Sequence, residues 1–124
     1  MDTEKDPAPV FSPNIRVRLM GAQPFFGPGV AELLRGIQAC GSIQGACERM
    51  GLSYSKSRIM LRRLEEELAY PVVKRSKGGV GGGSACLTDA GLALLTGYEQ
   101  YEREVSLYAQ KRFGALRTLL EQPS

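Results

Sequence analysis

The chain has 124 residues, a net charge of +3 and a mildly basic pI near 8.9. This length fits one domain with a modest core, and no apolar run approaches the length of a membrane span. The sequence has no histidine and only three cysteines, which argues against a catalytic triad or a zinc site. We therefore expect a cytoplasmic protein with no enzyme activity, metal, cofactor or membrane partner.

The chain is expected to open with a disordered tail and a strand. Residues 1–13 are polar, acidic and proline-rich, which is typical of disorder. Apolar and polar residues then alternate from Asn14 to Met20, which predicts a half-buried strand. Arg16 and Arg18 fall on its solvated face, and we assign them no further role. Residues 23–27 are predicted to turn the chain.

Two helices are predicted between Pro28 and Met50. Pro28 favours a helix start, and the first helix extends to Cys40. Ser42 is a suitable N-cap for the second helix, and Gly51 can adopt the left-handed conformation that ends it. The residues at helical spacing that we expect to be buried are Val30, Leu33, Leu34, Ile37, Ile43, Ala46, Cys47 and Met50. All three cysteines are expected to be small buried thiols.

The third predicted helix follows an N-cap at Ser53 and extends to Leu68. Its apolar face contains Ser57, Met60, Leu61, Leu64 and Leu68. The opposite face carries four basic residues between Tyr54 and Arg63 and no acidic one, whereas residues 65–67 are glutamates that would repel phosphate. Such a charge run is often only a solvated face, but a basic helix after a tight turn also suits an anionic DNA groove. We predict DNA contacts from Ser53, Tyr54, Ser55, Lys56, Arg58 and Arg62.

A β-hairpin is predicted next, with strands at Pro71–Val73 and from Ser84 into Thr88. The glycine run that joins them, residues 78–83, does not open a helix with Gly-Lys-Ser/Thr and so is not a P-loop. A helix-turn-helix followed by a hairpin is the plan of the winged helix-turn-helix, which is mainly α with α+β character. The predicted wing contacts to DNA backbone or minor groove come from Arg75, Lys77, Gly78 and Gly79.

The last predicted element is one long helix from Asp89 to about Leu120, with Thr88 as its cap. Its apolar residues step by four and three, as in a heptad seam. They are Leu94, Tyr98, Tyr101, Val105 and Tyr108. We predict that residues 14–88 form the DNA-binding domain and residues 89–124 a dimerisation helix. The alternative is that the seam packs on its own domain.

These motifs resemble the N-terminal DNA-binding domain of the molybdate-responsive ModE family of bacterial transcription regulators. The matching segments are Gly27-Pro28-Gly29, Leu33-Leu34, Gly41-Ser42-Ile43, Gly51-Leu52-Ser53-Tyr54 and the wing from Lys77 to Thr88. The resemblance implies a homodimer that binds a pseudo-palindromic, double-stranded operator and controls molybdenum transport or metabolism. The stretch from Arg62 to Leu68 is similar to LysR-type regulators as well.

One departure from the ModE pattern is visible. Full-length members carry β-barrel domains that bind molybdate or tungstate, whereas no β-rich segment follows the last predicted helix here. We expect no oxyanion sensor in this sequence, and a separate effector-binding protein where an effector acts. Three alternatives stay open: a LysR-like regulator, a winged-helix module that binds another protein through the same faces, and an enzyme or nucleotide-binding protein built on the glycine run.

Overall fold

The computed structural model describes residues 11–77 and 83–122, which form five helices and two antiparallel sheets of two strands each. The larger of two compact units is Arg16–Glu102, and the smaller combines the described parts of Met1–Ile15 and Arg103–Ser124. The elements are β1 (Leu19–Met20), β2 (Pro24–Phe26), α1 (Pro28–Cys40), α2 (Ile43–Met50), α3 (Tyr54–Leu68), β3 (Val73–Ser76), β4 (Ser84–Leu87), α4 (Asp89–Arg112) and α5 (Gly114–Glu121). This order confirms the predicted winged helix-turn-helix fold. None of the helices among these residues is long and apolar enough to cross a lipid bilayer.

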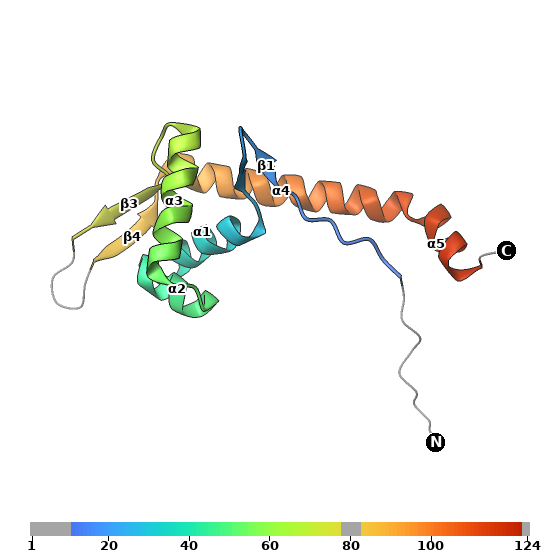
Figure 1. Ribbon diagram of the computed structural model, residues 1–124, viewed down its shortest axis with the longest axis horizontal. Helices are drawn as coiled ribbons and strands as arrows, with labels where there is room; N and C mark the ends of the chain where they lie inside the picture. The colour runs from blue at the N-terminus through green and yellow to red at the C-terminus, as the bar shows by residue number, and fades with distance from the viewer. Residues whose placement is uncertain (1–10, 78–82, 123–124) are drawn as a thin grey trace, which may run out of the picture. The chain divides into compact units, whose positions relative to one another are not determined.

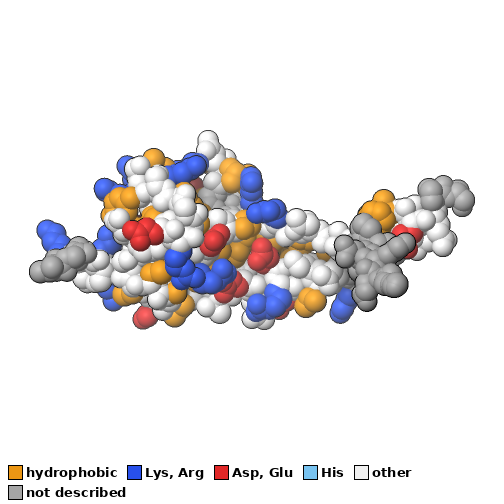
Figure 2. All heavy atoms as spheres, turned by 90° about the horizontal axis from the view of Figure 1, so that it is seen from below, with side chains coloured by type: hydrophobic (Ala, Val, Ile, Leu, Met, Phe, Trp, Pro, Cys, Tyr) orange, Lys and Arg blue, Asp and Glu red, His pale blue; other side chains and the backbone are white. Residues whose placement is uncertain are grey.

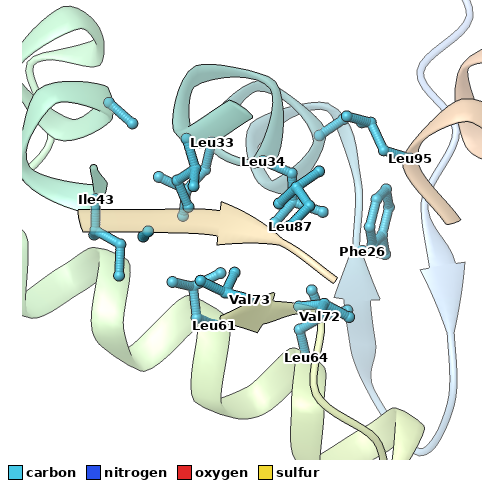
Figure 3. Close-up of a cluster of buried hydrophobic side chains, with 14 of the residues drawn as sticks. Phe26, Leu33, Leu34, Ile43, Leu61, Leu64, Val72, Val73, Leu87 and Leu95 are labelled. Atoms are coloured by element: carbon cyan, nitrogen blue, oxygen red, sulfur yellow. The ribbon is translucent and has the colours of Figure 1, made fainter. Parts of the chain in front are cut away.

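The core of the larger unit lies between α1, α3 and the β3–β4 hairpin, which we call the wing (Figures 1 and 3). Leu33 and Leu34 of α1 and Leu61 and Leu64 of α3 are fully buried, as their helical spacing predicts. Figure 3 shows Val72, Val73 and Leu87 between these two helices. Burying such a side chain contributes about 1.5–3 kcal/mol, so this shared core fixes the wing beside α3.

The N-terminal segment has the predicted alternation but little of the predicted strand. Exposure alternates from residue 15 to residue 20, yet only Leu19 and Met20 form β1. The prediction of a turn at residues 23–27 was wrong, because Pro24–Phe26 is β2 and pairs with β1. The turn lies earlier, where the Gly21 N–H donates to the Gln23 carbonyl at 3.0 Å. Proline is tolerated at the first residue of a strand. We call residues 19–26 the N-terminal hairpin.

The wing has a regular register that pairs Val73 with Leu87 and Ser76 with Ser84. Its first strand, Val73–Ser76, shares only Val73 with the predicted Pro71–Val73, and its second strand matches the prediction. The single long helix expected after Thr88 is instead two helices, because α4 ends at Arg112 and α5 begins at Gly114. The predicted tail over residues 1–13 lies largely outside the described residues.

The expectation of three buried thiols was wrong for two of them. Cys47 is buried on α2, but Cys40 and Cys86 are exposed. Cys40 is the last residue of α1, where the helix leaves the core. Cys86 lies on β4 between buried Ala85 and Leu87, so strand alternation turns it outward.

Candidate nucleic-acid interface

Two predicted serine caps fix the start of α2 and of α3. Ser42 Oγ accepts a hydrogen bond from the Gly45 N–H at 2.9 Å, and Ser53 Oγ accepts one from the Lys56 N–H at 3.1 Å. Between the helices, Gly51 adopts the left-handed conformation with φ of 67°, which is favourable for glycine because it has no Cβ. The tight turn that defines the helix-turn-helix is therefore encoded locally.

The buried and exposed faces of α3 are those that the sequence predicts. Ser57 is the polar residue on the buried face, and its hydroxyl donates to the Tyr54 carbonyl at 2.7 Å. The Arg58 guanidinium lies over the Tyr54 ring, 6.0 Å from its centroid, within reach of a cation–π interaction. The exposed positions are Tyr54, Ser55, Lys56, Arg58, Ile59, Arg62 and Arg63.

The wing brings a further cation to this helix face. Arg58 and Arg62 of α3, Arg75 of β3 and Glu65 line one hollow of about 350 Å³. We call Arg58, Arg62 and Arg75 the arginine cluster. A neighbouring hollow of about 670 Å³ lies between Tyr54 of α3 and the wing, where its lining includes Arg75 and Lys77. The structure thus brings together five of the predicted DNA-contact residues, Tyr54, Arg58, Arg62, Arg75 and Lys77.

Glu65 has a role that the sequence interpretation missed. Its carboxylate accepts hydrogen bonds from the Val72 N–H at 2.8 Å and the Val73 N–H at 3.2 Å. The residue expected to repel phosphate therefore fastens the start of the wing to α3. The signal that could have indicated this is a carboxylate on the half-buried side of the helix, one turn after buried Leu61.

The remaining predicted contacts lie in two other places. Ser53, Ser55 and Lys56 are exposed in the first turn of α3, where Ser53 also caps the helix. Gly78 and Gly79 lie outside the described residues, so their part in DNA binding stays a prediction.

The predicted dimer seam divides into buried and exposed residues. Tyr98 lies in the core of the larger unit, with its ring 4.7 Å from that of Phe26, and its hydroxyl donates to the Val17 carbonyl at 2.7 Å. The burial of Tyr98 therefore needs no second chain. Leu94 and Val105 are half-buried, whereas Tyr101 and Tyr108 are 54% and 65% exposed. The dimer role of the seam stays a prediction.

Another surface of the larger unit, formed by α1, α2 and α4, has mixed charge. Figure 2 shows blue and red side chains next to each other on the face turned toward the viewer, and blue ones at several points along its upper margin. A hollow of about 370 Å³ lined by Glu32, Arg35, Arg49 and Glu102 has this mixed character, and Arg35 is paired with Glu99. Across residues 11–77 and 83–122, no group of three His, Cys, Asp or Glu side chains could hold a metal ion.

Comparison with known proteins places this geometry among bacterial regulators. Residues 31–92, from α1 to the first turn of α4, match the profile described as bacterial regulatory helix-turn-helix protein, lysR family. The chain is 39% identical over 74 residues to the molybdenum-pterin-binding protein MopB of Rhodobacter capsulatus, which is 60% of this chain and 27% of that protein. It is 34% identical over 79 residues to the transcriptional regulator ModE of Haemophilus influenzae, or 64% of this chain and 31% of that one. The chain thus spans less than a third of the length of these relatives.

Proposed function

Because the chain belongs to the bacterial regulatory helix-turn-helix proteins of the lysR family, we propose that it regulates transcription by reading duplex DNA with α3 in the major groove. The observation that carries this proposal is the arginine cluster, in which Arg75 of the wing lines the same hollow as Arg58 and Arg62 of α3. Three guanidinium groups share this hollow with one carboxylate, that of Glu65, which already accepts two backbone hydrogen bonds, so positive charge remains in excess. A DNA backbone neutralises that excess because it brings a dense row of phosphates.

Within this proposal the contacts of α3 divide by position. Arg58 and Arg62 are four residues apart, a rise of about 6 Å along the helix, and each guanidinium can donate two hydrogen bonds to a guanine edge. Tyr54, beside Arg58, reads the same edge. Ser53 accepts the capping hydrogen bond, so its own hydroxyl hydrogen can still be donated to a phosphate. The remaining phosphate or minor-groove contacts are assigned to Ser55, Lys56, Arg75, Lys77, Gly78 and Gly79.

The proposed active form is a homodimer joined through α4. Tyr101 and Tyr108 are exposed and seven residues apart, which puts them on one side of the helix. A two-fold dimer binds a pseudo-palindromic operator whose half-sites are about 34 Å apart. Replacing both tyrosines with aspartate should give a folded monomer in sedimentation velocity, and a wild-type monomer would remove this part of the proposal.

The proposed target genes are those of molybdenum transport or metabolism. The support is the resemblance of the wing to the ModE family and the similarity to a molybdenum-pterin-binding protein and to ModE. Genomic footprinting of the native protein tests this directly, because the recovered sites give both half-site spacing and adjacent genes. If the recovered sites lie beside genes unrelated to molybdenum, the LysR-like alternative, with other target genes, would be favoured.

A binding titration tests DNA reading itself. If about 4–8 phosphates are neutralised per dimer, log K should fall with log salt at a slope of about −4 to −7. Arg58→Ala or Arg62→Ala should cost about 1–3 kcal/mol on a recovered site and less on random duplex. Lys77→Ala should weaken both by similar amounts. Arg49→Ala, an exposed arginine beside Glu32 and Glu102, is the charge-matched control. A slope near zero would favour the protein-interaction module instead.

A further inference from the structure

A second cationic surface lies on the other side of α3 from the wing. A hollow of about 400 Å³ opens between the N-terminal hairpin and α3. Its cations are Arg16, Arg18, Lys56 and Arg63, and its apolar lining includes Phe25 and Ile59. None of the described residues that line it is acidic. We call this the hairpin hollow.

The hairpin hollow and the arginine cluster lie on opposite flanks of the same helix. Residues advance by about 100° around a helix, so Arg58 and Arg62 turn toward the wing while Lys56 and Arg63 turn toward the N-terminal hairpin. Ile59 lies between the flanks and is 48% exposed. An apolar side chain at that position suits the methyl group of a thymine.

One cation of the hairpin hollow is fixed by a hydrogen bond, and three others are free of ion pairs within the described residues and can bind an anion. Arg63 Nη2 donates to the Gln23 side-chain oxygen at 3.1 Å, which holds this guanidinium against the turn of the N-terminal hairpin. Within the described part of the chain, Arg16, Arg18 and Lys56 form no ion pair. The Glu67 carboxylate lies beside Gly21 at the hairpin turn, and the cationic surface therefore ends there.

We propose that the hairpin hollow is a second phosphate-binding surface for the same duplex, with Arg16 and Arg18 as its principal contacts. The inference rests on the proposed function, because α3 in a major groove has one sugar-phosphate strand on each flank. The wing serves one strand, and the N-terminal hairpin serves the other. The cations of the hollow match the phosphates, and the half-buried Phe25 beside them matches the apolar face of the deoxyribose.

The test is a fluorescence titration of full-length protein against a fluorescein-labelled random-sequence duplex at several salt concentrations. Arg16→Gln with Arg18→Gln should lower affinity by about tenfold or more at low salt and make the salt slope shallower by about 2 per subunit. The preference for sites recovered by footprinting over random duplex should not change, because phosphate contacts carry no sequence information. Arg16→Lys with Arg18→Lys should restore most of the slope.

Three measurements keep the outcomes distinct. Thermal melting should be the same for wild type and both double variants, since Arg16 and Arg18 are exposed. If Lys77→Ala weakens DNA binding while Arg16→Gln with Arg18→Gln leaves affinity and slope unchanged, the second surface is excluded and the proposed function stands. If wild-type protein binds no duplex at any salt, both are excluded. Hydroxyl-radical footprinting should also show protected sugars on one flank of the major groove that only the Gln double variant loses.

Discussion

The wing and the N-terminal hairpin both border α3, but they are attached to the domain by different kinds of contact. The wing is fastened by backbone hydrogen bonds as well as by buried side chains. Its Ala85 N–H donates to the Gly41 carbonyl at 2.8 Å, which joins the wing to the turn after α1, and the Thr88 N–H donates to the Val72 carbonyl at 2.9 Å, which joins the two ends of the hairpin. The Glu65 carboxylate adds two hydrogen bonds at the start of β3. The wing's own residues Val73, Ala85 and Leu87 alternate toward the core and are buried there.

The N-terminal hairpin depends on side chains of residues distant in sequence. Its strands contain two and three residues, and their register shifts between Leu19 and Met20. Phe26, which is 2% exposed, packs on Tyr98 of α4, and the Tyr98 hydroxyl holds the Val17 carbonyl. We infer that the N-terminal hairpin needs this aromatic pair to stay folded, whereas the start of the wing, at Val72 and Val73, would stay folded without it. The following substitutions test that difference.

The largest effect is expected from Phe26→Ala. Removing a fully buried phenylalanine costs about 3–5 kcal/mol in the free energy of unfolding, and here it also removes the ring that Tyr98 packs on. Urea denaturation measures the loss, and Phe25→Ala, at the half-buried neighbour, should cost less. In hydrogen exchange, the amides of the N-terminal hairpin should lose more protection than those of Val73 and Leu87. An equal loss of protection in the N-terminal hairpin and in the wing would contradict the proposed difference between them.

The second effect is expected from Glu65→Ala, at the base of the wing. The change leaves the N–H groups of Val72 and Val73 without their acceptor, at a cost of about 3 kcal/mol for the two. Glu66→Ala removes the same charge from an exposed neighbour and should change stability by no more than about 0.5 kcal/mol. If both variants unfold at the same urea concentration, the carboxylate does not hold the wing.

A third change tests how closely α4 approaches the wing base. A Cβ on Gly91 would lie 3.0 Å from the Val72 carbonyl carbon and closer still to its oxygen. Gly91→Ala therefore forces backbone apart and should destabilise the protein by about 2 kcal/mol. Gly97, on the same helix, has open space around the same position, so Gly97→Ala should stabilise by up to about 1 kcal/mol through helix propensity. Similar melting temperatures for the two variants would refute the close approach.

The same contrast explains which parts of the structure the sequence could predict. The caps at Ser42, Ser53 and Thr88 and the buried stripes of α1 and α3 depend on residues within one or two turns, and they were predicted correctly. The wing strands were located to within about three residues because alternation and a glycine run mark them. The break between α4 and α5, at Phe113, was not predicted, because no such local pattern marks it.

What the sequence did not predict depends on long-range contacts. Pro24–Phe26 was interpreted as a turn because nothing local indicates that Phe26 packs on a tyrosine 72 positions later. In the candidate interface, the pattern gave the cations of α3 and β3 but not the role of Glu65, whose partners lie beyond the end of the helix. Arg16 and Arg18 were interpreted as a solvated strand face, since their nearness to Lys56 and Arg63 arises only when the hairpin packs on α3.

The smallest predicted effect concerns the hydroxyl that ties α4 to the N-terminal segment. Tyr98→Phe keeps the ring on Phe26 but removes the hydrogen bond to the Val17 carbonyl, which should cost about 1 kcal/mol near pH 7. Burial, and then the nearby Glu102 carboxylate, raise the pKa of Tyr98 above its usual value.

Above about pH 10 the unfolded chain loses the Tyr98 hydroxyl proton while the folded chain keeps it, so the contribution of Tyr98 to stability falls as pH rises. Urea denaturation between neutral pH and pH above 10 should therefore show the gap between wild type and Tyr98→Phe narrowing. Tyr101→Phe, at an exposed position of the same helix, should track the wild type throughout. A stability difference that stays constant into the alkaline range would mean that Tyr98 titrates alike in the folded and unfolded states, and that the segment around Val17 does not shield its hydroxyl.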